Sequence, residues 1–478
     1  MTAPPRAGSA DGAHDTIIIG AGPAGSIAAL VMARAGLDVV VLDKGHHVGQ
    51  RVGESFMPRA LQILRELDLE PELRKLAHIR KFGGEFMFGH EATGWIARFQ
   101  QAWPLGELEA FNLERAPFDD MLCRVAREAG ADVRCGVAVN KIDRLADGDV
   151  AVTTSAGPLS ARWLLDCSGQ ATVLGRLLAT RKIVGGLDRV AYFAIATGVT
   201  RKRYPDDGAV IGVLHDDGWF WAIPLDAERT SIGAVLRRDL AAKSGVKAHE
   251  MLRWAIERSP QMAARCRDAV LPDRNGVIAN FTYSCAPWAG PGYFMVGDAA
   301  AFLDPIFSTG VTLGMESARH AGQLVIELIH GRTSPRAARR AYAGRLDDVT
   351  NIFFGLVNAF YDASFRELFL SGKNPLNVRR AILTLLAGHA FEAPGYLRWR
   401  LQLLYLFIWL NRLVPLVGRS SAPSLLGVEA RPFVRGAAGA PPPPLKPRPL
   451  KLGVGGRISN IVADVLRGSD KSRSLGTQ

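Results

Sequence analysis

The chain has 478 residues, which is long enough for two or three domains with buried cores. Hydrophobic residues make up 48% and charged residues 22%, so the composition excludes a disordered or fibrous protein. Five scattered cysteines include no C-x-x-C pair, which argues against a metal site or a disulfide framework. Together with the lack of an apolar signal sequence before residue 15, this predicts a cytoplasmic protein with no bound metal.

The net charge is +12, and the basic excess is concentrated beyond Ala430. This segment contains nine basic residues and only two acidic ones, Asp464 and Asp470. We interpret residues 429–478 as a solvated basic tail, although such a segment could attract an acidic protein, nucleic acid or an anionic membrane. Because the tail lacks interleaved aromatic residues, we expect no nucleic-acid function.

A dinucleotide-binding fingerprint follows the first predicted strand. An apolar run over 16–19 leads into Gly20-Ala21-Gly22-Pro23-Ala24-Gly25, and a helix is expected from near Pro23, over 26–35. In this pattern Gly20 permits a tight turn, Gly22 lets the backbone approach a pyrophosphate, and Gly25 allows close packing of helix and strand. A second strand over 38–43 ends in Asp43, at the distance where a carboxylate can bind a ribose hydroxyl. Ala24 and Lys44 are assigned to the same cofactor site.

Alternating strand and helix patterns predict an α/β protein, mixed with α+β features, in several segments. A disordered N-terminus is expected over 1–14, and a Rossmann-like cofactor-binding domain over 15–185 that returns at 286–330. Between them, strand patterns predict an inserted β-sheet substrate domain over 186–285. A helical C-terminal region follows over 331–428, and Pro441 to Pro444 predict an extended linker.

The apolar stretch 401–410 is too short to cross a membrane, because a spanning helix needs about twenty apolar residues. A buried helix is the favoured interpretation. The alternative is a helix over 397–417 that makes peripheral contact with a membrane or docks a partner, since Trp399, Trp409 and the flanking arginines suit an interface.

Three further junctions support a tightly held flavin. Arg115 lies three residues before a helix expected to start at Phe118, residues 166–169 end a strand in a turn, and Asp298 begins a helix where ribityl hydroxyls need an acceptor. In this order they resemble the FAD-binding fold of the aromatic hydroxylase and geranylgeranyl reductase superfamily. The resemblance covers about residues 15–330 and implies FAD bound through Arg115 and Asp298 as well as the glycines.

Within that superfamily the sequence resembles the flavin-dependent halogenases that act on phenolic or pyrrolic substrates, which are often carrier-bound. Four stretches carry the likeness: Gly-Glu-Ser-Phe-Met-Pro at 53–58, Lys-Phe-Gly-Gly-Glu-Phe-Met-Phe-Gly at 81–89, Trp-Phe-Trp-Ala-Ile-Pro at 219–224, and Phe-Leu-Asp-Pro-Ile-Phe-Ser-Thr-Gly at 302–310. The departures are Cys167, where alanine is usual, and the basic tail.

The resemblance implies that reduced FAD, supplied by a separate flavin reductase, uses oxygen to turn chloride or bromide into hypohalous acid. It also implies that Lys81 directs this oxidant to an electron-rich aromatic substrate, which is either free or tethered to an acyl or peptidyl carrier protein. We expect Lys81 to follow a helix over 72–78 and to open an apolar strand, with its side chain inward. Glu85 would share its strand face and could assist deprotonation.

The remaining motif residues receive supporting roles from the same resemblance. Glu54, Ser55, Pro305 and Gly310 would lie beside the flavin. Ser308, Thr309 and Gly310 would bind halide, because a turn running into a helix over 312–322 offers backbone N–H groups. Trp219 and Trp221 alternate on a strand, so both face one side and would separate flavin from substrate.

Each of these interpretations has an alternative that the sequence leaves open. Lys81 could be a surface lysine, the two tryptophans a core pair, and 305–310 a flavin-contacting turn without halide. At the level of the whole chain, the alternatives are a flavin monooxygenase, an isoprenoid reductase of the same fold, and a flavin-binding protein without turnover.

Overall fold

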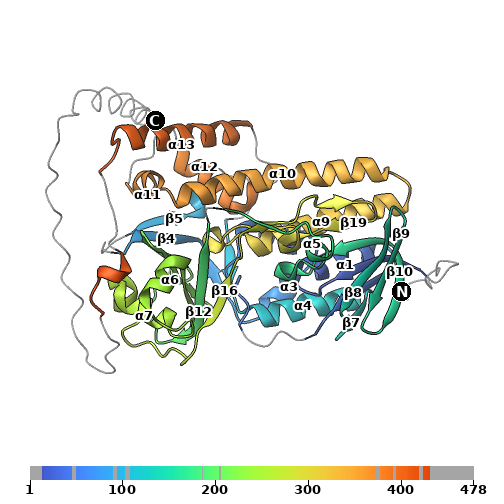
Figure 1. Cartoon of the computed structure of the whole chain (residues 1–478), viewed down its shortest axis with the longest axis horizontal. Coiled ribbons are helices and arrows are strands. Elements are labelled where there is room, and N and C mark those ends of the chain that lie inside the picture. Colours follow the sequence, from blue (N-terminus) through green and yellow to red (C-terminus); the bar gives the residue numbers. More distant parts are fainter. Residues whose placement is uncertain are drawn as a thin grey trace, which may run out of the picture.

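The computed structural model describes residues 13–45, 50–89, 94–102, 108–185, 187–203, 206–371, 377–390, 395–418 and 424–430. They form two large β-sheets side by side, with a stack of long helices lying across them (Figure 1). The expectations for residues 1–12, for the Pro-rich linker and for the basic tail from residue 431 onward lie outside the described residues.

The first sheet has a parallel centre with helices beside it. Its central order is β19-β10-β1-β2-β7, all paired in parallel, and the hairpin β8-β9 joins β10 in antiparallel fashion. The bounds are β1 (His14–Ile19), β2 (Val39–Asp43), β7 (Asp132–Cys135), β8 (Val139–Ala146), β9 (Asp149–Thr154), β10 (Gly157–Asp166), β18 (Ala289–Gly290) and β19 (Tyr293–Met295). Buried β-branched residues in β1 and β2 suit a parallel sheet covered on both faces. This confirms the predicted Rossmann-like fold.

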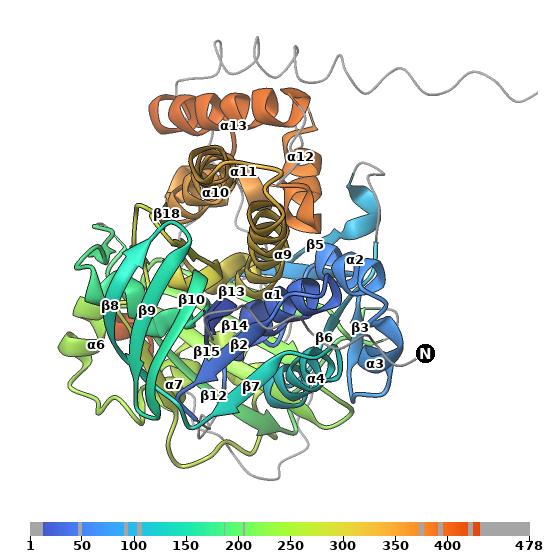
Figure 2. The same ribbon diagram turned by 90° about the vertical axis from the view of Figure 1, so that its right-hand side faces the viewer.

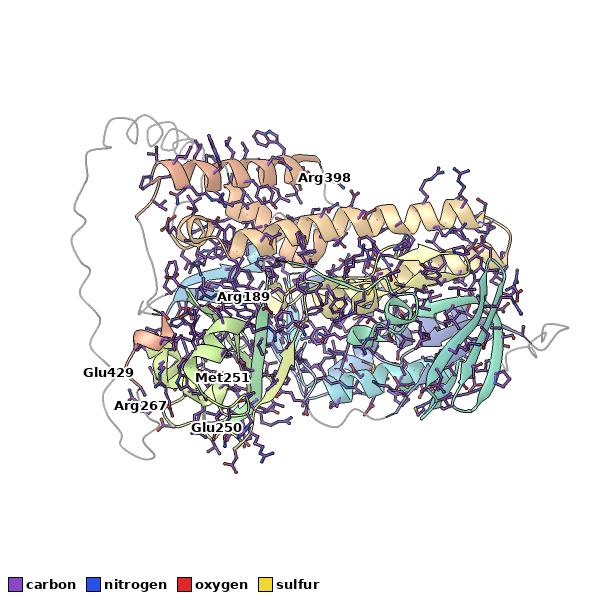
Figure 3. The ribbon with its side chains drawn as sticks, in the orientation of Figure 1. Arg189, Glu250, Met251, Arg267, Arg398 and Glu429 are labelled. Atoms are coloured by element: carbon purple, nitrogen blue, oxygen red, sulfur yellow. The ribbon has the colours of Figure 1, made fainter. Side chains whose placement is uncertain are left out.

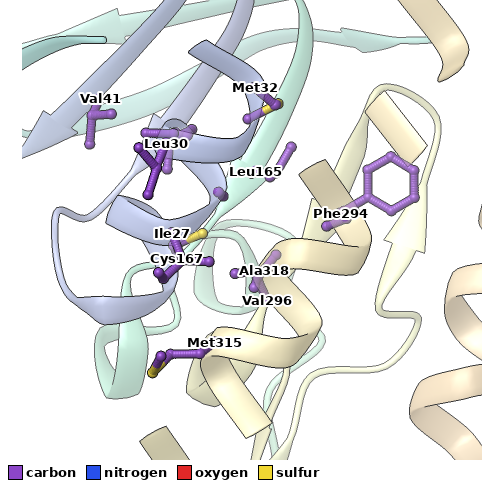
Figure 4. Packing of buried hydrophobic residues seen from close by; sticks show 14 of the residues in the cluster. Ile27, Leu30, Met32, Val41, Leu165, Cys167, Phe294, Val296, Met315 and Ala318 are labelled. Carbon is purple, nitrogen blue, oxygen red and sulfur yellow. The ribbon is translucent and has the colours of Figure 1, made fainter. Parts of the chain in front are cut away.

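Helix α1 (Pro23–Arg34) follows the glycine turn and packs against α9 (Gly310–Ile329) and α4 (Arg115–Glu128). Figure 4 shows Ile27 of α1 and Met315 and Ala318 of α9 in one apolar cluster, all of them fully buried. The contact between α1 and α9 therefore joins two segments almost three hundred residues apart, one from each part of the cofactor-binding domain. Cys167, at the end of β10, belongs to the same cluster.

The second sheet is a mostly antiparallel layer in the order β16-β12-β15-β14-β13-β4-β5. The bounds are β4 (Gly83–Phe88), β5 (Trp95–Arg98), β12 (Arg189–Thr197), β13 (Val210–His215), β14 (Gly218–Pro224), β15 (Arg229–Arg237) and β16 (Gly276–Ala279). Only β13 and β4 run parallel. Strands β4 and β5 therefore belong to this sheet, whereas the predicted boundaries put them in the first part of the cofactor-binding domain.

The two faces of the second sheet are buried by different helices. Alternate residues of β12 to β15 pack on α7 (Met251–Arg258) and α8 (Pro260–Arg265), next to α6 (Arg238–Ser244). The opposite residues, which include Trp219 and Trp221, pack toward the C-terminal helices. This period of two is the expected pattern of a sheet buried on both sides.

The C-terminal helices form a layer of their own. They are α10 (Pro335–Phe360), α11 (Ala363–Leu370), α12 (Val378–Thr384) and α13 (Gly395–Leu413). Figure 2 shows α13 as the outermost of the described helices, above α10 to α12. Among the residues that the structure describes, no helix is long and apolar enough to cross a membrane.

Short elements complete the fold. They are α2 (Pro58–Glu66), α3 (Glu70–Arg74), α5 (Val173–Leu177), β3 (Ile79–Lys81), β6 (Ala110–Asn112), β11 (Lys182–Ile183), β17 (Tyr283–Ser284) and β20 (Ala301–Phe302). Strand β3 pairs only with β6 in a two-stranded ribbon.

Three predicted helix starts are wrong. Helix α4 begins at Arg115 rather than Phe118, since Pro117 falls in the first turn, where a backbone N–H has no helical partner to lose. Helix α9 begins at Gly310 rather than residue 312. The helix expected over 72–78 is α3, which begins at Glu70 and ends at Arg74. The start expected near Pro23 is confirmed, because α1 begins at that residue.

Candidate active site

A deep cleft opens where the parallel strands β1, β2, β10 and β19 end at their carboxyl edge. It has about 2260 Å³ of empty space, including its open mouth. Ligands bind at this edge in doubly wound folds, because the turns there carry free backbone groups. The predicted cofactor residues that line it are Gly20, Gly22, Ala24, Asp43, Lys44, Arg115, Asp298 and Gly310.

The glycine turn has the shape that a pyrophosphate needs. A Cβ on Gly22 would meet no atom within 4 Å, and its φ of −71° is one that any residue adopts. Gly20 has a φ of +100°, and a Cβ there would lie 2.5 Å from the Cys167 carbonyl oxygen. Gly25 does not line the cleft, and its Cβ would lie 1.8 Å from the Gly20 carbonyl oxygen. Gly22 therefore leaves open space, Gly20 allows the turn conformation, and Gly25 allows close packing.

The Asp43 carboxylate ends β2 at the cleft. It accepts hydrogen bonds from the backbone N–H groups of Ala21 (2.9 Å) and Gly45 (3.0 Å). These bonds fix the carboxylate beside the glycine turn, and each oxygen keeps a lone pair for a ligand hydroxyl. The residues present thus fit the dinucleotide part of FAD.

Two charged residues that also line the cleft, Arg115 and Asp298, are half-buried. Burial raises the pKa of Asp298 to about 6, and the Arg115 guanidinium opposes this shift. Arg115 also donates to the Val52 carbonyl oxygen (3.1 Å) and pairs with Asp119 (3.0 Å), which also pairs with Arg51. Arg115 thereby joins α4 to the Gly53-Glu54-Ser55 loop.

Lys81 is buried, with 4% of its surface exposed, and its ammonium contacts that same loop. Its Nζ donates to Ser55 Oγ (2.9 Å) and to the Phe56 carbonyl oxygen (3.0 Å), and it lies 5.6 Å from the centre of the Phe99 ring. No carboxylate is among these contacts, so burial lowers the pKa of Lys81 to about 7. The amine can therefore exist in both protonation states near neutral pH.

The predicted surroundings of Lys81 need correction. The lysine ends the short strand β3 instead of opening an apolar strand, and Glu85 lies in β4 of the second sheet. Phe82 separates the two strands, and β4 begins at Gly83, which lies so close to β5 that a Cβ there would be 2.1 Å from the Ala97 carbonyl oxygen. Glu85 pairs with Lys202 (2.8 Å) and Arg265 (3.6 Å), so it is not a partner of Lys81.

Hydrogen bonds link the Gly53-Glu54-Ser55 loop to the tryptophan strand. Glu54 is buried, which raises its pKa, and it accepts from Gln50 Nε2 (2.6 Å). The same Gln50 amide donates to Ser231 Oγ (3.1 Å), which also accepts from Trp221 Nε1 (3.2 Å). Two of the motifs recognised in the sequence are thus parts of one polar network.

A second chain of hydrogen bonds links the tryptophan strand to the loop over 304–310. Trp219 Nε1 donates to the Tyr361 hydroxyl (3.1 Å), which donates to Asp304 Oδ2 (2.7 Å). Burial raises the pKa of Asp304 to about 6. Its other oxygen accepts from the Ile306 N–H (3.0 Å) and caps the turn that follows.

The loop over 305–310 ends where α9 begins. Ser308 adopts a left-handed conformation (φ 55°), and Thr309 and Gly310 line a smaller pocket of about 650 Å³ that adjoins the cleft. This pocket is lined mainly by apolar side chains, and it shares Asp298 and Gly310 with the cleft. Pro305 lines neither pocket.

The rings of Trp219 and Trp221 lie on one side of β14, with centres 5.7 Å apart, as the alternation predicts. Both are almost fully buried and belong to the core that joins the second sheet to α10–α13. The two tryptophans are therefore a packed pair in the hydrophobic core.

Sequence reasoning missed three basic residues of the cleft, Arg51, Arg127 and Arg176. Arg51 could have been found from its place two residues before the Gly-Glu-Ser motif, whereas Arg127 and Arg176 have no signal beyond their charge. Among the described residues, no cluster of histidine, cysteine and carboxylate side chains could hold a metal ion.

The comparisons with known proteins agree with this site. A tryptophan halogenase family model matches residues 104–368, and an FAD dependent oxidoreductase model matches residues 15–179. One similar protein is the 1H-pyrrole-2-carbonyl-[peptidyl-carrier protein] brominase of Pseudoalteromonas luteoviolacea, 28% identical over 80% of this chain and 94% of that protein. Another is the flavin-dependent halogenase armH3 of Armillaria mellea, 29% identical over 73% of this chain and 74% of that protein.

The fold is also similar to those of solved flavin-dependent halogenases. The flavin-dependent brominase Bmp2 superposes with a TM-score of 0.74 at 26% identity, over 84% of this chain and 99% of that chain. The myxobacterial chondrochloren halogenase CndH gives a TM-score of 0.69 at 27% identity, over 83% and 97%. The chain therefore belongs to the tryptophan halogenase family and is an FAD-dependent halogenase, an oxidoreductase that uses halide to halogenate an aromatic compound.

Proposed function

We propose that this halogenase chlorinates or brominates an electron-rich phenolic or pyrrolic ring, and that Lys81 is the residue that directs the oxidised halogen. The observation that carries the proposal is the buried ammonium of Lys81, held by Ser55 and the Phe56 carbonyl with no carboxylate of the described residues in contact. An unpaired buried cation is costly, so a lysine there calls for a functional reason.

When bound in its reduced form, FAD would activate oxygen, which is the oxidant that converts halide to hypohalous acid. The residues proposed to hold it are those that line the cleft: Gly20, Gly22, Ala24, Asp43, Lys44, Arg115, Asp298 and Gly310, with Gly25 supporting the turn. Glu54, Ser55 and Pro305 do not line the cleft and are proposed to support the loops beside it. The open space beside Gly22 and the fixed Asp43 carboxylate support this assignment.

Lys81 is suited, in either protonation state, to the step that follows halide oxidation, in which the halogen is directed to the substrate. As an ammonium it donates a hydrogen bond to hypohalous acid, and as a free amine it can accept the halogen. The lowered pKa of Lys81, about 7, makes both forms accessible near neutral pH. Ring substitution then needs a proton acceptor, a role for which Glu85 is unsuitable because Lys202 and Arg265 pair with it.

We place the halide at Ser308, Thr309 and Gly310, where the N-terminus of the twenty-residue helix α9 meets the cleft. The left-handed Ser308 supports this proposal, because such a turn can direct the backbone N–H groups that follow it, those of Thr309 and Gly310, to one side. The Ser308 N–H itself donates to the Pro305 carbonyl oxygen. Trp219 and Trp221 are proposed to keep the substrate away from the flavin, which would favour halogenation over direct oxygen transfer.

Two partners belong to the same proposal. The relatives include a brominase and a chlorinase of a pyrrole held on a peptidyl carrier protein, so a carrier-tethered substrate is proposed here too. A separate flavin reductase is proposed to supply reduced FAD, since the sequence contains one dinucleotide fingerprint.

The test is to supply the purified protein with reduced FAD, oxygen, and bromide or chloride in the presence of a chromogenic phenol. Halogenated product is expected, and NADPH without an added flavin reductase should support only slow turnover. If NADPH alone is oxidised rapidly, with stimulation by the phenol and hydroxylated product, the chain acts as a monooxygenase on that substrate and the proposed use of Lys81 is wrong.

A further inference from the structure

Helix α13 has an outward face that is unusual for a surface helix. Its buried residues include Leu397, Leu401, Leu404 and Ile408, which pack on the helices beneath it. A surface helix normally carries polar residues on the opposite face. Here that face carries Trp399 (55% exposed), Leu406 (46%), Trp409 (53%) and Leu413 (62%).

The helical spacing puts these four side chains in one line. At 100° per residue, positions 399, 402, 406, 409 and 413 fall within a narrow arc, in which Gln402 is the single polar residue. Figures 1 and 2 show α13 lying along the outside of the molecule, with no described element above it. The line is therefore accessible along its whole length, as far as the described residues extend.

All charged residues of this helix are basic. The helix contains no aspartate or glutamate, and Arg398 and Arg412 flank the apolar line. Both arginines pair with the helices below, Arg398 with Asp348 (3.0 Å) and Arg412 with Asp362, yet about half of each side chain stays exposed. Figure 3 labels Arg398 near the start of the helix. The tail over 431–478 adds nine basic residues against two acidic ones.

The size of the patch argues against a second copy of the chain as its occupant. Two half-exposed tryptophans and two leucines offer on the order of 400–500 Å². A stable interface between two proteins buries about 800 Å² on each partner. A lipid surface has no such threshold, because each apolar side chain that enters the interface contributes separately, and basic residues add attraction to anionic headgroups.

We infer that the outward face of α13 docks this enzyme on an anionic lipid surface. Trp399, Leu406, Trp409 and Leu413 enter the boundary between headgroups and acyl chains, with the helix axis parallel to the membrane. The exposed parts of Arg398 and Arg412 contact the headgroups. The aromatic substrates of such an enzyme then meet it at the membrane surface, while the flavin cleft stays in the aqueous phase.

The inference is tested with the full-length protein and two sets of vesicles, phosphatidylcholine alone and phosphatidylcholine with phosphatidylglycerol. Cosedimentation is expected to favour the anionic vesicles at least tenfold, and added salt should reduce that preference. The variant Trp399→Gln/Trp409→Gln is expected to lower binding at least tenfold, with unchanged thermal unfolding and unchanged halogenation in solution.

The matched control is Ile183→Gln/Val270→Gln, which removes two apolar side chains of similar exposure (53% and 56%) far from α13 in the sequence. It is expected to bind vesicles like the parent. Equal binding by the tryptophan variant and the parent, or equal binding to the two sets of vesicles, would overturn the inference. So would concentration-dependent self-association that only the tryptophan variant loses, since the patch would then bind a second copy.

Discussion

Lys81 combines two properties that a structural lysine does not need: it is buried, and within the part of the chain that the structure describes no carboxylate contacts it. We expect Lys81→Met to lower halogenation by about 10²–10⁴-fold, the usual effect of removing a proton-transfer group. FAD binding and oxygen consumption should persist, because methionine keeps the apolar stem and the change lies outside the cleft lining. The readout is product formation beside flavin retention. Bromination at the parent rate would show that Lys81 is structural.

The same side chain makes stability depend on pH. The pKa of Lys81 is about 7 in the folded protein and 10.5 in the unfolded chain. Between these values the unfolded chain binds a proton that the folded protein does not, so stability rises with pH across this window. Below pH 7 both states are protonated and the cost of burying the ammonium is complete. Lys81→Met should therefore unfold at a higher temperature than the parent below pH 7, and the difference should shrink as the pH rises toward 10.5. A difference that grows with pH would contradict the lowered pKa.

A substitution at Gly22 can test cofactor binding without disturbing the fold. A valine at this position meets no protein atom and needs no unusual backbone angle, so the fold should be retained. Its side chain would occupy the space proposed for the pyrophosphate, and the purified protein should lose its yellow colour. The control is Gly344→Val in α10, where a Cβ also meets no atom within 4 Å. Stoichiometric flavin in Gly22→Val would refute the assignment.

At the scale of elements, Tyr361 joins strand β14 to the loop that begins at Asp304. Tyr361→Phe leaves a buried Trp219 N–H without its acceptor and removes one hydrogen bond from a buried carboxyl group. Such losses cost about 1–3 kcal/mol in the free energy of unfolding. Denaturant unfolding measures this cost, and halogenation should fall with it because the loop proposed for halide loses its support. Tyr192→Phe is the control, since Tyr192 is also buried but has no side-chain hydrogen bond among the described residues. Equal stability of the two variants would exclude the proposed coupling.

Some elements of the fold were predictable from the sequence and others were not. The glycine turn, β1, β2 and β14 were predictable because each has a regular apolar pattern beside a glycine or proline signal. The place of Lys81 was not, because β3 has three residues and its pairing with β6 joins segments about thirty residues apart. The Tyr361 bridge was equally hidden, since nothing local marks a tyrosine at the end of α10 as a partner of Trp219.

At the scale of the whole molecule, the cleft is built from segments spread over some three hundred residues, from Gly20 to Gly314. A cofactor that touches all of them binds the folded protein and not the unfolded chain. FAD at a hundred times its dissociation constant should therefore stabilise the protein by about 2.7 kcal/mol. Thermal unfolding of the apoprotein with increasing FAD measures this directly, and Gly22→Val should show no shift while Lys81→Met shifts like the parent. A shift in Gly22→Val equal to that of the parent would mean that FAD binds somewhere other than the glycine turn.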